Sequence, residues 1–262
     1  MNTIVILGGG ISGLGSALLA KRNNYNVFVS DTGSISDSTK DILIKSSIKF
    51  EEYSHEKAKT IEPDLIIISP GIPPTCDIIT FFMAKSIKMI SEIEFASIHC
   101  KSQIIAITGS NGKTTTTTLT HKLISDAGFS CSISGNIGNS FSDVCEDDVD
   151  FSVLEVSSFQ LDRVDNFKPH IAIITSITPD HLDRYKNFDA YVDSKFKMIK
   201  NQSDEDYLIY DSDCKTINKY IKTKNIKSKL FPFSLKKKVK KGAFFLKNEI
   251  NIITYKNKFN MP

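Results

Sequence analysis

Short apolar segments alternate with longer amphipathic segments along this chain, and the alternation constrains the fold more than any other feature. The apolar segments of strand length are residues 3–7, 27–30, 65–69, 104–108, 151–156, 171–175 and 207–210. Strands that are separated by helix-length segments pair in parallel and are covered by helices. The sequence therefore predicts an α/β protein with a mainly parallel sheet.

The pattern restarts near residue 92, where the helix-like segment 91–98 leads into a new strand and a second glycine-rich loop. At 262 residues the chain is long for one domain and natural for two, since domains commonly contain about 100–200 residues. We predict two domains, over residues 1–92 and residues 93–262.

Charge and cysteine content exclude several classes of protein. Thirty-three basic and thirty acidic residues give a net charge of +3, which predicts neither nucleic acid nor an anionic membrane as a partner. The five cysteines are widely spaced and form no C-x-x-C pair, so neither a disulfide framework nor a zinc site is predicted. No apolar segment approaches the eighteen or so residues of a membrane span, and the apolar start lacks the flanks of a signal peptide. We expect a soluble, cytoplasmic, monomeric protein.

A first glycine-rich loop, Gly8-x-Gly10-x-x-Gly13, directly follows the first predicted strand and opens a helix, and Asp31 follows the next strand. This context satisfies the dinucleotide-binding fingerprint. A glycine turn at a helix N-terminus nevertheless offers its N–H groups to any phosphate. NAD or FAD, another phosphorylated nucleotide and a purely structural turn therefore all remain open.

A second turn, residues 69–73, ends the strand 65–69 with the sequence Ser-Pro-Gly-Ile-Pro. Ligands of open α/β sheets bind along the carboxyl edge, where this turn is expected. The alternative is a rigid loop framed by prolines, with no role in binding.

A second glycine-rich loop, Thr-Gly-Ser-Asn-Gly-Lys-Thr at residues 108–114, follows an apolar strand. It fails the strict P-loop expression, because Ile107 stands where a glycine is required. Its chemistry is preserved: Gly109 and Gly112 permit an anion-binding turn, Lys113 can reach the β- and γ-phosphates, and the Thr114 hydroxyl can bind Mg²⁺. This loop predicts that the chain is an ATP-dependent enzyme.

Polar residues at the ends of two later strands extend this candidate site. Glu155 lies within an apolar segment, where a buried carboxylate requires a cation or a donor, so a Mg²⁺ ligand is favoured over a solvent-facing glutamate. His181 lies in a polar cluster after the strand 171–175, and it gains a chemical role only together with Lys113 and Glu155. Lys195, taken alone, is expected to be an exposed surface lysine.

The lysine-rich segment 236–241 lies between two strand-like segments, 229–233 and 243–246. It is either a basic binding tract or a solvated hairpin connection. The hairpin connection is favoured, because the run is short and has no interleaved aromatic residues.

Four motifs together resemble the Mur ligases, in the branch that adds D-glutamate. They read TGSNGKT at 108–114, GNIG at 135–138, LEVSSFQL at 154–161 and ITPDHLDRY at 177–185. The third motif discriminates best between this branch and its sister enzymes. The resemblance covers essentially the whole chain and favours a UDP-linked substrate, rather than NAD or FAD, for the first glycine-rich loop.

The resemblance implies that residues 1–92 form a Rossmann-like domain, in which UDP is held by two sets of residues. The first set is Ser12, Gly13, Leu14, Asp31 and Thr32, and the second is the turn that contains Ser69, Pro70 and Gly71. Gly33 departs from the family, since an arginine is common there, and this puts one contact to the uridine end in doubt.

The resemblance implies that residues 93–262 form a mononucleotide-binding domain of the P-loop type, with a site for ATP and two Mg²⁺ ions. The implied ATP-binding residues are Ser110, Asn111, Gly112, Lys113, Thr114, Thr115 and Thr116. The implied metal ligands are Thr114, Glu155, His181 and Lys195, the last as a carbamylated lysine.

The resemblance also implies that Asn136 and His181 contact the muramoyl-alanine substrate, and that the catalytic residues are Lys113, Asn136, Glu155, His181 and Lys195. Ser176 departs from the family, where an asparagine is usual, and a hydroxyl does not repeat the paired contacts of an amide.

The implied activity is ATP-dependent addition of D-glutamate to UDP-N-acetylmuramoyl-L-alanine in peptidoglycan synthesis, through an acyl phosphate. The family has a third, C-terminal domain, and the sequence ends at Pro262, so we expect substrate binding without efficient turnover from these residues alone. The alternatives are another Mur-type or folylpolyglutamate-type ligase, and a non-catalytic nucleotide-binding remnant.

Overall fold

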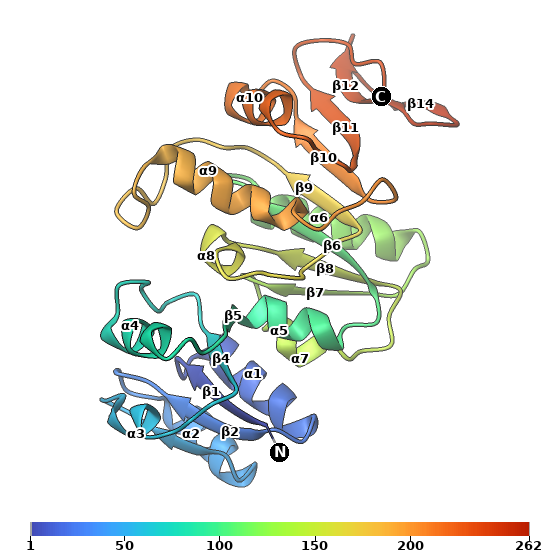
Figure 1. The fold of residues 1–262 in the computed structure, drawn as a ribbon. Helices are drawn as coiled ribbons and strands as arrows, with labels where there is room; N and C mark the ends of the chain where they lie inside the picture. The colour runs from blue at the N-terminus through green and yellow to red at the C-terminus, as the bar shows by residue number, and fades with distance from the viewer. Residues whose placement is uncertain (1, 262) are drawn as a thin grey trace. The chain divides into compact units, whose positions relative to one another are not determined.

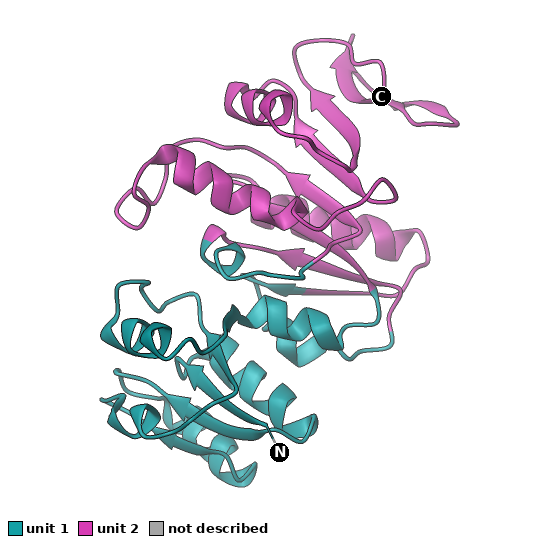
Figure 2. Cartoon of the chain, in the orientation of Figure 1, with its two compact units in different colours: residues 1–102, 134–148, 159–167 teal, residues 103–133, 149–158, 168–262 magenta. Residues whose placement is uncertain are grey.

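The computed structural model describes residues 2–261, and it confirms the predicted α/β architecture with two sheets (Figure 1). Two compact units are distinguished by their internal contacts (Figure 2). Unit 1 contains residues 1–102, 134–148 and 159–167, and unit 2 contains residues 103–133, 149–158 and 168–262. The domain boundary near residue 92 stays a prediction.

Unit 1 is built on a five-stranded sheet in which all strands are parallel, in the order β3-β2-β1-β4-β5. The strands are β1 Thr3–Leu7, β2 Asn26–Ser30, β3 Lys49–Glu51, β4 Leu65–Ile68 and β5 Met89–Ser91. The helices are α1 Ile11–Arg22, α2 Asp37–Lys45, α3 Glu56–Lys59, α4 Asp77–Ala84, α5 Glu92–His99 and α7 Phe141–Val144. Strands β3 and β5 were not predicted, because three residues give too little periodicity to detect.

The strand order places a topological switch point between β1 and β4. The chain leaves β1 toward β2 and β3 on one side, and β4 and β5 lie on the other side. Connections that run away in both directions open a crevice at the carboxyl ends of these two strands. The two predicted UDP loops follow β1 and β4 and therefore border the same crevice.

The second sheet has nine strands in the order β14-β13-β12-β11-β10-β9-β6-β8-β7. The bounds are β6 Gln103–Thr108, β7 Cys131–Gly135, β8 Phe151–Glu155, β9 Ile171–Ile174, β10 Tyr207–Asp211, β11 Lys229–Ser234, β12 Gly242–Leu246, β13 Glu249–Ile253 and β14 Lys258–Met261. The helical segments are α6 Lys113–Asp126, α8 Ser158–Leu161, α9 Phe188–Phe196, η1 Lys197–Ile199 and α10 Lys215–Thr223. Strand β6 pairs in parallel with β8 and β9, so the loop after β6 lies at a second switch point.

The lysine-rich segment is not a hairpin connection, so that prediction was wrong. Strands β11 and β12 pair in parallel, with Phe233 opposite Ala243. Gly242 begins β12 at a φ of +121°, and a side chain there would collide with the carbonyl of Pro232. This close approach lets β12 join the sheet parallel to β11. The spacing of the lysines does not reveal the direction of that strand.

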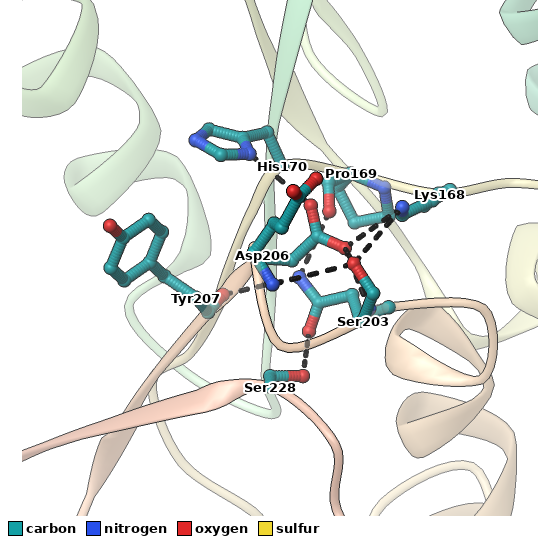
Figure 3. A network of polar contacts seen from close by, with 9 residues as sticks. Lys168, Pro169, His170, Ser203, Asp206, Tyr207 and Ser228 are labelled. Atoms are coloured by element: carbon teal, nitrogen blue, oxygen red, sulfur yellow. Dashed lines mark hydrogen bonds and ion pairs between the residues drawn. The ribbon is translucent and has the colours of Figure 1, made fainter.

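A polar network fixes the amino ends of β9 and β10 (Figure 3). Buried Asp206 accepts hydrogen bonds from Ser203 and ion-pairs with Lys168 at 3.1 Å, and its other oxygen lies 3.2 Å from Nδ1 of His170. Burial raises the pKa of Asp206, but the hydrogen bonds from Ser203, Lys168 and His170 outweigh it and hold the pKa below its ordinary value. The network lies at the edge opposite the glycine-rich loop and stabilises the sheet.

Glu92, at the start of α5, is a fully buried acid whose stability contribution depends on pH. Its Oε1 accepts a 2.6 Å hydrogen bond from Gln160, and within residues 2–261 its Oε2 has no hydrogen-bond partner. Burial raises the pKa of Glu92 from its ordinary value near 4.5 to about 7, although the hydrogen bond from Gln160 lowers it. The folded chain therefore favours the neutral acid.

We predict that Glu92→Gln removes a pH-dependent loss of stability. The pKa of Glu92 is higher in the folded chain than in the unfolded chain. The contribution of neutral Glu92 to the free energy of unfolding is therefore complete below pH 4.5 and is lost as pH rises to about 7. This difference in pKa between the folded and unfolded states corresponds to about 3 kcal/mol in the free energy of unfolding. Urea unfolding at pH 5 and pH 8 should show the variant gaining stability relative to wild type at the higher pH. The exposed Glu249→Gln is the control, and equal pH profiles for Glu92→Gln and wild type would disprove the prediction.

Candidate nucleotide-binding site

The glycine-rich loop after β6 forms a tight turn at the start of α6. Gly112 precedes this helix at a φ of +80° and has no side chain with which to cap the N–H groups of the first turn. A side chain at Gly109 would collide with the Thr175 hydroxyl. Glycine is required at both positions for different reasons, and the uncapped helix end is suited to an anion.

The loop is held in place by the segment that follows β9. The N–H of Ser110 donates to the carbonyl of Ser176 at 2.8 Å, and the N–H of Asn111 donates to the Ser176 hydroxyl at 3.0 Å. The Thr175 hydroxyl donates to the carbonyl of Asn111 at 2.6 Å. Ser176, which replaces the usual asparagine, thus supports the loop with both its backbone and its hydroxyl.

Lys113 and Thr114 project from the first turn of α6, as the P-loop interpretation requires. The Lys113 ammonium donates to the carbonyls of Gly109 and Ser110, at 2.9 and 3.2 Å. The Thr114 hydroxyl donates to Oε2 of Glu155 at 2.7 Å. Thr115 and Thr116 continue the same turn of the helix.

Glu155 ends β8 and is 2% exposed, so the alternative of a solvent-facing glutamate is wrong. Parallel pairing with β6 places this carboxylate beside the start of α6. A hydroxyl and a carboxylate that share one position are the hard oxygen ligands that Mg²⁺ prefers. Among residues 2–261, no group of three or more His, Cys, Asp or Glu side chains gathers at one metal-sized position.

Lys195 is buried, so the expectation of an exposed surface lysine was wrong. It lies on α9, is 2% exposed, and donates from Nζ to the carbonyl of Gly109 at 3.0 Å. The same ammonium lies 4.7 Å from the centre of the Tyr191 ring. Packing of α9 against the phosphate loop turns this lysine inward, and the sequence periodicity of a nine-residue helix does not reveal which face is covered.

His181 follows β9 in the polar cluster and adopts a left-handed backbone conformation, with a φ of +51°. Its Nε2 lies 3.5 Å from Asp180, and its ring centre lies 6.4 Å from that of Tyr191. Such backbone strain is concentrated at functional sites. The side chain is half-exposed and can meet a ligand.

Tyr191 is a site residue that the sequence interpretation missed. It is fully buried, its hydroxyl lies 3.0 Å from the Ser110 hydroxyl, and its ring contacts both Lys195 and His181. The spacing of four residues between Tyr191 and Lys195 was the available signal, because it places both side chains on one face of a helix.

In unit 1, the loop after β1 forms a second uncapped helix end. Gly10 precedes α1 without a side-chain cap, and a side chain at Gly13 would collide with the carbonyl of Gly8. Asp31 accepts hydrogen bonds from the N–H groups of Gly9 and Gly33, at 2.6 and 2.7 Å. Asp31 therefore fixes the shape of two loops, and Gly33 supplies a backbone donor where the family commonly has arginine.

The other predicted UDP-binding residues surround this crevice. Residues Ser69 to Ile72 form a turn that is closed by a 3.1 Å backbone hydrogen bond and includes Pro70 and Gly71. The Ser69 hydroxyl is buried, and among residues 2–261 it has no hydrogen-bond partner. Ser12 and Leu14 lie in the first turn of α1, and Thr32 is exposed after β2. An unsatisfied buried hydroxyl at a ligand crevice indicates a polar ligand.

Asn136 lies in the loop after β7 and belongs to unit 1. Gly135 and Gly138 flank it with φ values of +103° and +64°, and the N–H of Gly135 donates to the carbonyl of Asn139 at 3.1 Å. The GNIG motif is thus a tight turn whose glycines are required by their backbone conformation.

The glycine-rich loop lies at a switch point of the mainly parallel sheet, and the helix that follows it carries a lysine and a threonine that pairs with Glu155 of β8. This is the arrangement of a P-loop-type fold. Residues 107–260 match the Mur ligase middle domain, and residues 3–78 match the MurD N-terminal domain. The chain belongs to the Mur ligase family.

Two relatives show how far the similarity extends. The UDP-N-acetylmuramoylalanine–D-glutamate ligase of Christiangramia forsetii is 48% identical over 262 residues, which are 99% of this chain and 59% of that protein. The enzyme of the same name from Bacteroides fragilis is 40% identical over 263 residues, 100% of this chain and 59% of that protein. The chain thus spans 59% of the length of these curated relatives.

Solved structures share the fold at low sequence identity. The UDP-N-acetylmuramate:L-alanyl-gamma-D-glutamyl-meso-diaminopimelate ligase from Neisseria meningitides aligns with a TM-score of 0.63 at 15% identity, covering 98% of this chain and 86% of that chain. The UDP-N-acetylmuramate-alanine ligase from Thermotoga maritima aligns with a TM-score of 0.56 at 19% identity, covering 99% of this chain and 60% of that chain.

Among residues 2–261, no helix combines the length and apolar character needed to cross a bilayer.

Proposed function

We propose that this protein adds D-glutamate to UDP-N-acetylmuramoyl-L-alanine, using ATP. The observation that carries the proposal is the phosphate loop at 109–114, with Lys113 and the Thr114–Glu155 pair at its helix end. Similarity to D-glutamate ligases over nearly the whole chain supports the choice of substrate. A role in peptidoglycan synthesis, a cytoplasmic location and a monomeric state remain predictions.

The residues around the loop fit ATP with Mg²⁺. The N–H groups in the first turn of α6 and Lys113 would hold the phosphates, and Thr114 and Glu155 would hold one Mg²⁺. His181 and Lys195 would serve a second Mg²⁺, with Lys195 carbamylated into a carboxylate-like ligand. Mg²⁺ would neutralise charge on the phosphate oxygens as it develops.

In unit 1, the crevice between β1 and β4 would hold UDP. The uncapped end of α1 would face the diphosphate, and the Ser69 hydroxyl would gain the partner it lacks among the described residues. Asn136 would position the carboxylate of the muramoyl-alanine substrate.

The reaction then proceeds in two steps. The γ-phosphoryl group of ATP passes to the substrate carboxylate, which gives ADP and an acyl phosphate. The amine of D-glutamate attacks the acyl carbon, an amide bond forms, phosphate leaves, and the amine loses its proton. Lys113 stabilises negative charge in the first step, and the fixed loop positions the phosphates, so positioning and charge neutralisation supply most of the rate.

A panel of four ligands tests this proposal by thermal unfolding of the 262-residue chain. UDP-N-acetylmuramoyl-L-alanine and ATP with Mg²⁺ should each raise Tm, whereas NAD and FAD should not. A ligand at 100 times its Kd stabilises the native state by about 2.7 kcal/mol. A rise in Tm with NAD or FAD alone would contradict the proposal and favour a nicotinamide or flavin protein.

Turnover requires a second measurement, the release of ADP that depends on D-glutamate. Binding of both ligands without such release from this chain would match a nucleotide-binding remnant as well as an incomplete ligase. Release that depends on a different amino acid would assign the chain to a sister ligase of the same fold.

A further inference from the structure

The near-neutral net charge hides a strong segregation of charge along the chain. Residues 214–262 carry fourteen lysines and a single acidic residue, Glu249. Residues 1–213 carry nineteen basic and twenty-nine acidic residues. A net charge of +3 therefore conceals a C-terminal segment with thirteen excess positive charges, which favours anionic partners locally.

Five of these lysines line one hollow of about 890 Å³ in unit 2. Lys215, Lys219 and Lys222 come from α10, and Lys236 and Lys237 come from the connection after β11. The spacing of four and then three residues places the first three on one face of the helix. All five are exposed, and within residues 2–261 none of them forms an ion pair with a carboxylate.

The single acidic residue in the wall of the hollow, Asp213, offsets only part of this charge, through its interaction with Lys237. Asp213 accepts hydrogen bonds from the Ser234 hydroxyl and from the N–H of Leu235, both at 2.8 Å. Its carboxylate therefore fixes the connection that carries Lys236 and Lys237. Like charges four residues apart on a helix also destabilise it, so an anion in the hollow would relieve repulsion on both walls.

The walls are rigid enough to form a site. Ile217 of α10 is fully buried, and Tyr220 stacks on Phe196 with ring centres 3.7 Å apart. Both contacts hold α10 by the face opposite the lysines. A preformed concave wall loses less entropy on binding than a flexible lysine tail does.

The hollow lies at the same edge of the sheet as the phosphate loop. It is formed where β10 and β11 end, and β10 is two strands from β6 in the sheet order. Two strand spacings separate the two regions by about 10 Å along this edge. We propose that the hollow is a second phosphate-binding site, which takes a multivalent phosphate anion independently of the loop at 109–114.

Two sources could present this chemistry, a soluble polyphosphate or a phosphate-bearing lipid headgroup. The probes are therefore inorganic pyrophosphate and vesicles of phosphatidylglycerol, with phosphatidylcholine vesicles as the neutral reference. Lys219→Gln with Lys236→Gln removes one charge from each wall. Lys256→Gln with Lys258→Gln is the matched control, because both lysines are exposed but lie outside the hollow.

Pyrophosphate also binds phosphate loops, so its titration by calorimetry is carried out in the Lys113→Ala background. Binding should weaken about tenfold or more in the hollow variant and less than about twofold in the control, and added salt should weaken it further. Binding to phosphatidylglycerol vesicles alone, lost in the hollow variant, would support the site and assign it to a lipid headgroup.

Equal losses of probe binding in the hollow and control variants would overturn the proposal, because they would show that the anion is attracted by the general positive charge of the segment and not by the hollow. Failure of both probes to bind would also overturn it. Neither result bears on ATP binding at Lys113. If the proposed function is correct, the hollow variant made in the wild-type chain still binds ATP.

Discussion

Lys113→Ala is expected to weaken ATP binding about 10- to 100-fold and to abolish ATP-dependent ligation. The ammonium lies at the N-terminal turn of α6, within 3.2 Å of the carbonyls of Gly109 and Ser110. A charge-assisted hydrogen bond contributes about 1.5–3 kcal/mol, which corresponds to this loss. The variant also lacks the ammonium that stabilises negative charge during phosphoryl transfer, so the reaction rate falls by more than the binding affinity.

Titration of ATP with Mg²⁺ by calorimetry measures the first effect, and ADP release measures the second. Lys122→Ala is the matched control, because Lys122 lies on the same helix and only pairs with Asp126 at the surface. The control should bind ATP as wild type does. Full ATP-dependent ligation by Lys113→Ala would refute the assignment of the loop.

Glu94→Ala is expected to lower the free energy of unfolding by about 3–5 kcal/mol. Glu94 is 1% exposed, and its carboxylate accepts from the N–H groups of Asp165, Asn166 and Phe167 at 2.8 to 3.0 Å. These residues belong to unit 1 but follow α8 in the sequence. Removal of the carboxylate leaves three backbone donors without their acceptor, and each such loss carries a desolvation penalty.

Urea unfolding at constant pH measures this loss as a shift of the midpoint at unchanged slope. Glu146→Ala is the comparison, because Glu146 pairs with Arg22 at the surface and its side chain is 39% exposed. An exposed ion pair contributes less than about 1 kcal/mol. Equal losses for the two variants would show that the three N–H contacts of Glu94 are not a stabilising unit.

The amino-acid sequence alone determined the α/β class and most of the central strands. The strands β1, β2, β4, β6, β8, β9 and β10 were all predicted to within one residue at each end. Buried parallel strands are apolar throughout, so they stand out from the polar connections. Gly8, Gly13, Gly109 and Gly112 were equally clear, because each has a positive φ or a close backbone approach that excludes a side chain.

The sequence could not determine which side chains meet across the sheet. Glu155 was suspected from its apolar surroundings, but its contact with Thr114 follows from the parallel pairing of β8 with β6. The three-residue strands β3 and β5, the five-residue strand β7 and the parallel pairing of β12 also escaped detection. Pairing partners are set by contacts between distant segments, which periodicity does not encode.

The clearest contrast is between Lys113 and Lys195. Lys113 was identified from its neighbours in sequence, since a glycine-rich turn fixes the position of the next lysine at the helix start. Lys195, taken alone, gave no local signal, and only the packing of α9 against the loop buries it beside Gly109 and Tyr191. Sequence determined the chemistry of the loop because that chemistry is local, whereas tertiary packing decided which distant side chains complete the site.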